Sequence, residues 1–328
     1  MKPKNWHLAV FTLSFAAGCS GTESSAPAGN PSAPPVFAYE NEEVRVDSDL
    51  VVPAGSTGRI GPGVSFAADA DVKILVQGVL VIEGSAASPA RSTGSGTPSS
   101  WYGIQVEAGG KLQLQHAEIR EARYGIHTLP GSDFTVDYAD INGGFKVAVI
   151  ESDGTFDHSK FAGSTPDSIS IAFEVSIDDP NGTMTIMNAS PTITNSQFDG
   201  ASAITDMVRI GGESKPVFDH VLIQKAHCGF HNFGAVNNSP IVKNSIFRQL
   251  SYGVMAFQTK PVFENNVFEG NTNDVGLCLG ASAENAPVLT GNYYSSGSAL
   301  IDAGCFQIGT AESSPASAPI EGAGPVGL

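Results

Sequence analysis

Apolar and polar positions recur in a fixed order in the second half of the chain. Three eight-residue segments share the order proline, two apolar residues, a polar residue, histidine or asparagine, two variable residues and an apolar residue; they are 216–223, 240–247 and 261–268. Their first residues are 24 and 21 positions apart. A period in the low twenties is typical of a solenoid, in which each repeat forms one coil and stacks on the next.

The repeat extends to eight copies when the histidine or asparagine position is taken as the reference. The reference residues are His116, Tyr138, His158, Asn195, His220, Asn244, Asn265 and Gly291. Two positions earlier stand Leu114, Val136, Phe156, Ile193, Phe218, Val242, Phe263 and Leu289. Three positions later stand Ile119, Ile141, Phe161, Phe198, Ile223, Phe247, Phe268 and Tyr294. We predict that these two apolar columns line the inside of the coils. The reference position is then a turn whose side chain hydrogen-bonds the backbone and stacks on its neighbour, which makes His116, His158 and His220 structural rather than ligating residues.

A second short strand follows the reference residue in most copies. These strands are predicted at 124–126, 147–149, 169–171, 207–210, 229–230 and 253–254. One copy is longer than the rest, because 37 residues separate His158 from Asn195, against 20 to 26 elsewhere. The excess falls in residues 162–190 and predicts a loop that projects from the coils.

Residues 44–110 contain short alternating strands that are interrupted by glycine and proline turns. The stretches 49–55, 60–64, 76–84 and 101–104, with Ser88-Pro89, resemble the first coils of bacterial right-handed parallel β-helix proteins, the pectin-lyase-like fold. The chain is therefore predicted to be all-β, a single-stranded right-handed parallel β-helix solenoid of about eleven coils over residues 44–310. At about 4.8 Å per coil it would be roughly 50 Å long. Residues 311–328 are predicted to be disordered or to lie loosely over the end.

The first residues have the composition of an export signal. Lys2 and Lys4 precede the apolar stretch 8–17, and small residues lead to Cys19. This pattern resembles the bacterial lipoprotein signal, which implies diacylation of Cys19, for example by palmitate, and attachment to the cell outer membrane. An ordinary secretory signal cleaved near Ala17 is the alternative.

The domain boundaries follow from these features. Residues 1–18 are predicted to be the lipoprotein signal peptide, and residues 19–43, rich in Ser, Ala, Pro and Gly, a flexible tether. The net charge of −16 over 328 residues falls to about −18 when Lys2 and Lys4 are removed with the leader. Such a surface repels nucleic acid, which is excluded as a partner.

Three cysteines remain in the predicted mature fold. Cys278 and Cys305 are 27 residues apart, close to the local repeat of 26, so adjacent coils bring them within disulfide reach and a bridge is predicted. Cys228 and His231 lie near each other in sequence, and Met255 stands one coil further in the column of His231. Sulfur and imidazole ligands suit copper, whereas a buried, inert Cys228 is the structural alternative.

No assembled catalytic set is evident. The pectin-lyase-like resemblance implies either paired aspartates for hydrolysis or a calcium-bound acidic cluster with a basic residue for β-elimination. Here the acidic residues are scattered. The best candidate surface combines Asp178 and Asp179 with Arg209 and His231, as a groove for a sugar or calcium ion. No cofactor is otherwise predicted.

These observations favour a lipid-anchored protein of the cell envelope that is not a catalyst and binds surface polysaccharide or a protein partner. A polysaccharide lyase or glycoside hydrolase on the same scaffold is the first alternative. A periplasmic metal-handling or assembly factor is the second, and it depends on Cys228, His231 and Met255.

Overall fold

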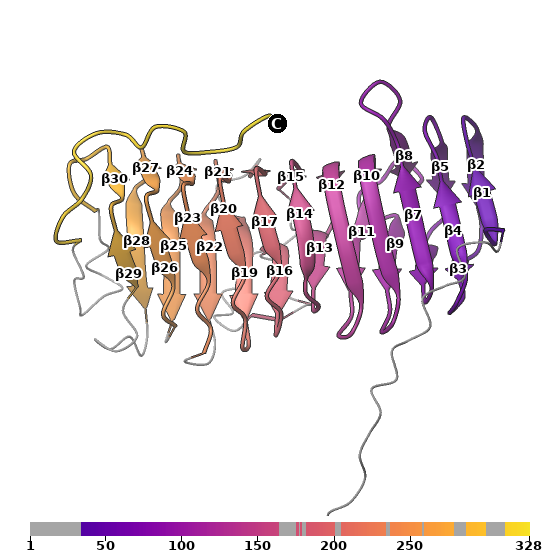
Figure 1. Cartoon of the computed structure of the whole chain (residues 1–328), viewed down its shortest axis with the longest axis horizontal. Helices are drawn as coiled ribbons and strands as arrows, with labels where there is room; N and C mark the ends of the chain where they lie inside the picture. Colours follow the sequence, from indigo (N-terminus) through magenta and orange to yellow (C-terminus); the bar gives the residue numbers. More distant parts are fainter. Residues whose placement is uncertain are drawn as a thin grey trace, which may run out of the picture.

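The chain forms an elongated parallel β-helix (Figure 1). The computed structural model describes residues 34–163, 175–176, 178, 182–200, 205–233, 237–257, 259–278, 287–299 and 312–328. These residues contain thirty β-strands and no helix, and all of the strand pairs among them are parallel. The predicted fold class, an all-β right-handed parallel β-helix, is confirmed.

Each coil contributes up to three short strands to two sheets. The first sheet has twenty strands in two adjacent rows and the second has ten. The first row holds β1 Phe37–Tyr39, β4 Thr57–Ile60, β7 Val79–Glu83, β14 Gly154–Asp157, β17 Thr192–Thr194, β20 Val217–Asp219, β23 Ile241–Lys243, β26 Val262–Glu264 and β29 Val288–Thr290. The second row holds β2 Glu43–Val46, β5 Ser65–Ala68, β8 Ala90–Thr93, β15 Lys160–Ala162, β18 Gln197–Asp199, β21 Leu222–Gln224, β24 Ile246–Arg248, β27 Val267–Glu269 and β30 Tyr293–Tyr294. Two longer strands, β10 Lys111–Arg120 and β12 Asp133–Asn142, run through both rows.

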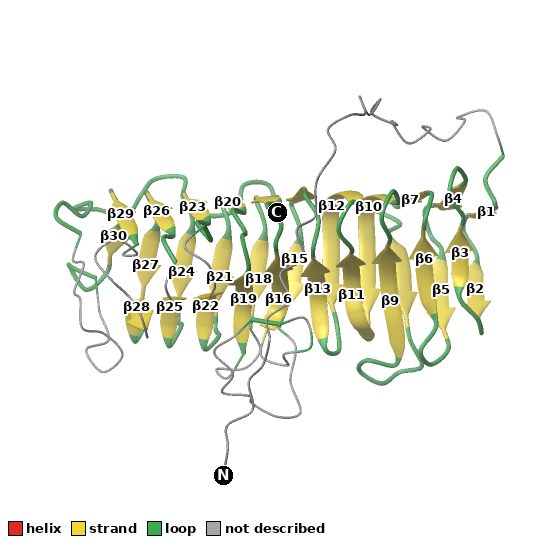
Figure 2. Cartoon of the chain, turned by 90° about the horizontal axis from the view of Figure 1, so that it is seen from below, coloured by secondary structure: helices red, strands yellow, loops and turns green. Residues whose placement is uncertain are grey.

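The second sheet contains one strand from each coil (Figure 2). Its strands are β3 Leu50–Val52, β6 Lys73–Val76, β9 Trp101–Val106, β11 Ala122–Thr128, β13 Lys146–Ile150, β16 Gly182–Met187, β19 Asp206–Gly211, β22 Cys228–Phe233, β25 Tyr252–Phe257 and β28 Asn273–Cys278. Consecutive strands are one turn apart, so the ten strands span nine complete turns, somewhat fewer than the eleven coils predicted.

Both predicted apolar columns are confirmed. The strand registers join the first column from Leu114 through Val136 and onward to Leu289, one residue per coil. They join the second column from Ile119 to Tyr294 in the same way. Aromatic rings stack face to face within the second column, with centroids 4.7 to 5.1 Å apart in three pairs. Burial of these side chains supplies the main favourable term in folding.

The reference residues form the corner between the two rows of the first sheet. All eight have a left-handed backbone, with φ from 44° at His158 to 65° at Gly291. Glycine, asparagine and histidine are enriched in this conformation, so their mixture at this position has a backbone cause, which does not extend to Tyr138. The rings of His116, Tyr138 and His158 also stack, with centroids 4.6 Å apart.

A second polar column lies one residue after the corner and was missed in the sequence. Its members are buried hydroxyl and amide side chains: Ser159, Ser196, Ser245, Asn266 and Asn292. The side-chain oxygen of each accepts a hydrogen bond from the backbone N–H of the equivalent residue in the preceding coil, at 2.9 to 3.2 Å. Glu312 Oε1 accepts the N–H of Asn292 at 3.0 Å, so the C-terminal segment closes the last coil.

The boundaries of the fold differ from those predicted. Strand β1 begins at Phe37, inside the predicted tether, and β16 lies inside the predicted projecting loop 162–190. The predicted strand 169–171 falls outside the described residues. Residues 312–328 were predicted to be disordered or loosely placed, but the segment lies back along the coils (Figure 1). It is held there in part by the Gly324 N–H, which donates to the Asn244 carbonyl at 2.8 Å.

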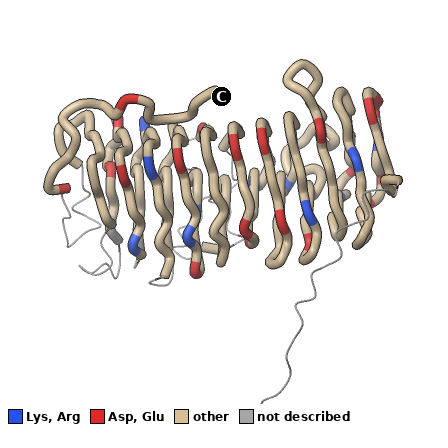
Figure 3. The backbone as a smooth tube through the Cα atoms, in the orientation of Figure 1, with Lys and Arg blue, Asp and Glu red and all other residues tan. Residues whose placement is uncertain are grey.

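Acidic and basic side chains are interspersed along the β-helix (Figure 3). Several form pairs between neighbouring coils, such as Arg45 with Asp69 and Lys111 with Asp133. Within the part of the chain that the structure describes, no helix has the length and apolar character needed to cross a bilayer.

Candidate functional site

The buried acidic, basic and histidine side chains that the structure describes, among them His127, Asp206, Arg209 and His231, lie on strands of the second sheet. Its registers align His127, Val149, Thr185, Arg209, His231 and Met255 in one column. His127 and His231 therefore lie four coils apart, and the predicted placement of Met255 one coil beyond His231 is confirmed. Strands β13, β16, β19 and β22 are buried over nearly their whole length. Polar groups gather at both ends of this buried stretch.

The first group lies at the end nearer the N-terminus and is named the Tyr102 cluster; it comprises Lys73, Tyr102, Arg123, Tyr124, His127 and Glu151. Tyr102 on β9 and His127 on β11 are joined by a hydrogen bond of 2.9 Å between Oη and Nδ1. His127 Nε2 lies 3.3 Å from Glu151 Oε2, one coil further on. Three consecutive coils thus supply a chain of phenol, imidazole and carboxylate.

Protonation in this chain follows from burial. Burial lowers the pKa of His127 below its usual value, although the hydrogen bond and the charge of Glu151 oppose the shift. Burial and the neighbouring Tyr124 raise the pKa of Tyr102 to about 12. At neutral pH both groups are therefore uncharged. The consistent arrangement has Tyr102 donating to Nδ1 of His127 and Nε2–H donating to Glu151.

Two members of the Tyr102 cluster, Lys73 and Arg123, are cationic. Lys73 Nζ lies 5.3 Å from the centroid of the Tyr102 ring, and the guanidinium of Arg123 lies 5.4 Å from that of Tyr124. Arg123 is exposed to solvent and Tyr102 is half-buried. In such a pair the cation can contact the carboxylate of an acidic sugar, and the aromatic ring can pack against the apolar face of that sugar.

The second group lies four coils away and is named the sulfur–imidazole cluster; it comprises Asp206, His227, Cys228, His231 and Met255. Cys228 Sγ lies 3.0 Å from Met255 Sδ and 3.3 Å from His227 Nδ1. Asp206 contacts both imidazoles, with Oδ1 at 3.1 Å from His227 and Oδ2 at 3.3 Å from His231. Donor atoms of Asp206, Cys228 and His231 all lie within 4.8 Å of one another.

Arg209 completes the charge balance of the sulfur–imidazole cluster. Its Nη1 lies 3.7 Å from Asp206 Oδ2, and its Nη2 lies 3.4 Å from His231 Nε2. Burial alone would raise the pKa of Asp206, but hydrogen bonds from the two histidines and the Arg209 charge outweigh it and hold that pKa far below the usual range. Burial, reinforced by the Asp206 charge, raises the pKa of the Cys228 thiol well above its usual value.

The predicted site residues are only partly brought together. Arg209 and His231 are neighbours, as expected. The negative charge of Asp178 contributes to raising the pKa of Tyr102 and acts in the same direction on the pKa of His127, so Asp178 lies near the Tyr102 cluster. The placement of Asp179, Cys19 and Cys305 and of the Cys278 side chain lies outside the described residues, so the Cys278–Cys305 bridge stays a prediction.

Seven members of the two clusters were not predicted as site residues from the sequence: Tyr102, Tyr124, Lys73, Arg123, Glu151, Asp206 and His227. A signal for the first was present, because Tyr-Gly pairs occur at 102–103, 124–125 and 252–253, in each case in a strand of the second sheet. Gly103 is required there, since a methyl group at its position would overlap the Tyr124 carbonyl.

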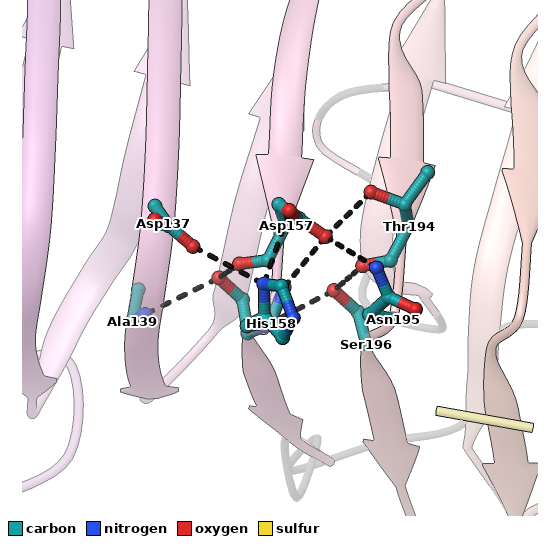
Figure 4. Close-up of polar contacts among 8 residues, drawn as sticks. Asp137, Ala139, Asp157, His158, Thr194, Asn195 and Ser196 are labelled. Atoms are coloured by element: carbon teal, nitrogen blue, oxygen red, sulfur yellow. Dashed lines mark hydrogen bonds and ion pairs between the residues drawn. The ribbon is translucent and has the colours of Figure 1, made fainter. Parts of the chain in front are cut away.

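A third cluster, around His158, is explained by the fold. His158 Nδ1 lies 3.0 Å from Asp157 Oδ2 and 3.5 Å from Asp137 Oδ1 (Figure 4). Asp157 Oδ1 also accepts hydrogen bonds from Thr194 at 2.6 Å and Asn195 at 2.9 Å. Against the effect of burial, these donors and the His158 charge lower the pKa of Asp157. Its contacts join adjacent coils at the corner, which is the structural role predicted for this histidine.

No family model matches the chain, and no curated protein matches it. The solved structure of an alginate lyase from Paenibacillus sp. str. FPU-7 is similar over 73% of this chain and 91% of its own, with a TM-score of 0.39 and 12% sequence identity.

Proposed function

We propose that this chain is a lipid-anchored protein of the cell envelope that binds an acidic polysaccharide on the outer face of the second sheet. The observation that carries the proposal is the pairing of Lys73 and Arg123 with the rings of Tyr102 and Tyr124. In a chain with a net charge of −16, the cluster offers an acidic sugar two cations, Lys73 beside the half-buried ring of Tyr102 and Arg123 beside the buried ring of Tyr124. The regular spacing of coils would present such groups along an extended glycan.

The envelope location is supported by the sequence before the fold. Lys2, Lys4, the apolar stretch 8–17 and Cys19 have the order of a lipoprotein signal. Labelling of the full-length chain with a palmitate analogue should be lost in Cys19→Ser and retained in Cys228→Ser. Equal labelling of both variants would contradict the anchor without affecting the sugar-binding proposal.

Binding is tested with the soluble domain and a panel of polyuronates and neutral glucans. We expect a polyuronate to bind and a neutral glucan not to bind, with affinity falling as salt is raised because the attraction is electrostatic. Arg123→Ala should weaken binding about tenfold, which corresponds to about 1.4 kcal/mol. The matched control is Arg59→Ala, since Arg59 is an exposed arginine in the first sheet that pairs with Glu83. Equal affinity of both variants would overturn the proposal.

A polysaccharide lyase is the second candidate, favoured by the hydrogen-bonded chain of Tyr102, His127 and Glu151. β-Elimination from a uronate needs a cation to neutralise the sugar carboxylate and a group that removes the adjacent proton. Arg123 can supply the first. Tyr102 can supply the second after passing its own proton to the neutral His127, whose resulting charge Glu151 stabilises.

Turnover separates the two candidates on the same panel. A lyase should release unsaturated products, and Tyr102→Phe should abolish their formation while binding is largely retained. Binding without unsaturated or reducing-end products supports the non-catalytic proposal.

A further inference from the structure

We propose that the sulfur–imidazole cluster binds one Cu(I) ion through Cys228 Sγ, Met255 Sδ and His227 Nδ1. This inference concerns β22 and β25, four coils from the Tyr102 cluster, and it is independent of the proposed polysaccharide binding. The three donor atoms come from two adjacent coils, and Cys228 lies 3.0 Å from Met255 and 3.3 Å from His227.

The geometry suits a shared ion. Sulfur and imidazole ligands lie about 2.0 to 2.3 Å from a first-row metal, so a pair of them is at most about 4.6 Å apart. Both separations lie below that limit, so the Met255 and His227 side chains must rotate slightly away from Cys228 Sγ to admit the ion. Cys228 is fully buried, whereas the His227 side chain is 41% exposed and gives the cluster an edge that faces solvent.

The structure selects His227 over His231 as the imidazole ligand. Arg209 donates toward His231 Nε2 at 3.4 Å, which leaves the His231 proton on Nδ1, directed at Asp206 Oδ2. His231 is therefore fixed between two charged groups. His227 Nδ1 contacts Asp206 Oδ1, but the His227 side chain is 41% exposed, so its proton can move to Nε2 when a metal takes Nδ1.

The chemistry favours a soft, singly charged ion. Asp206, the only carboxylate in the cluster, is already paired with Arg209, His227 and His231 and is poorly available to hard cations. Thiol and thioether ligands favour Cu(I). On binding, the S–H bond breaks, a Cu–S bond forms and the proton leaves to solvent. The Cu(I) ion replaces the thiol proton, so the net charge of the buried cluster is unchanged. Copper keeps its oxidation state, so no oxidant or reductant is required.

The test is a competition of the full chain against a chromophoric Cu(I) chelator without oxygen, with the metal supplied as Cu(I). We expect one tightly bound ion per chain and sulfur ligands in its X-ray absorption spectrum. Met255→Leu should weaken binding at least tenfold, and it keeps the side-chain volume, so the fold is retained. The matched control Met187→Leu changes a methionine at the end of β16 and should leave the affinity unchanged.

Four further variants complete the test. Cys228→Ser should abolish tight binding, and His227→Gln should weaken it more than His231→Gln does. A Cys278→Ser, Cys305→Ser double variant should bind copper as the original chain does. Unchanged stoichiometry in Cys228→Ser, loss of copper in the double variant, or equal affinity of Met255→Leu and Met187→Leu would each overturn the proposal.

Discussion

Replacement of Asn266 by alanine tests the buried polar column. The Asn266 side chain is fully buried; its Oδ1 accepts the Ser245 N–H at 2.9 Å, and its Nδ2 donates to the Val242 carbonyl and to Asn292 Oδ1, each at 3.0 Å. Alanine leaves a buried N–H without this acceptor, which costs about 1–3 kcal/mol, and each lost carbonyl or amide bond adds about 1 kcal/mol. We expect Asn266→Ala to lower the free energy of unfolding by about 3–5 kcal/mol.

The measurement is urea unfolding followed by far-ultraviolet circular dichroism. The matched control is Asn237→Ala, because Asn237 is an exposed asparagine whose Nδ2 donates to exposed Glu213 at 3.2 Å. Its effect should stay within about 0.5 kcal/mol. Asn266→Ser should lose less than Asn266→Ala, since serine performs the same role at Ser196. Equal unfolding midpoints for Asn266→Ala and Asn237→Ala would refute the reasoning.

Three further outcomes are expected. His220→Asn should leave the unfolding midpoint nearly unchanged, whereas His220→Val should lower stability by about 1–2 kcal/mol, because φ is 56° there and a β-branched residue resists the left-handed conformation; equal effects would contradict the corner role. Tyrosinate absorbance of the original chain minus that of Tyr102→Phe should show a group that titrates near pH 12. The folded state holds the Tyr102 proton more tightly than the unfolded chain does, because the pKa of an unfolded-chain tyrosine is about 10. The stability that this proton contributes should therefore be present below about pH 10 and lost as the pH rises toward 12. A difference absorbance that titrates near pH 10 would argue against burial of Tyr102. Glu312→Ala should lower the thermal midpoint by removing the acceptors of Asn292 and the Tyr294 hydroxyl, and an unchanged midpoint would argue against a closing role for this segment.

The apolar columns could be predicted because every coil repeats one requirement. Phe218, Val242 and Phe263 cover one another, and any polar residue there would be buried without a partner. The buried polar column was harder to find because serine and asparagine satisfy the same backbone N–H, while Val221 interrupts the series. A position that changes residue type so freely has no simple sequence pattern.

The candidate site was less predictable for a geometric reason. Tyr102, His127 and Glu151 come from three coils, and a register shift between β9 and β11 breaks the constant spacing that would have aligned them. In the second group, regular register allowed His231 and Met255 to be placed together. The sequence did not reveal the contact between Asp206 and His227, because His227 precedes β22 and lies outside the strand register, while the register partner of Asp206 is Cys228.

The C-terminal segment changes how the end of the β-helix can unfold. In a solenoid each coil contacts only its neighbours, so the last coil would fray alone. Here residues 312–328 bind Asn292 near the end and Asn244 two coils earlier, and Gly327 lies against the ring of His158 further back. Opening of the last coil therefore also releases contacts made several coils away. The segment therefore makes fraying of the last coil cooperative. It also protects the backbone amide hydrogens of that coil, which would otherwise open first, from exchange with solvent.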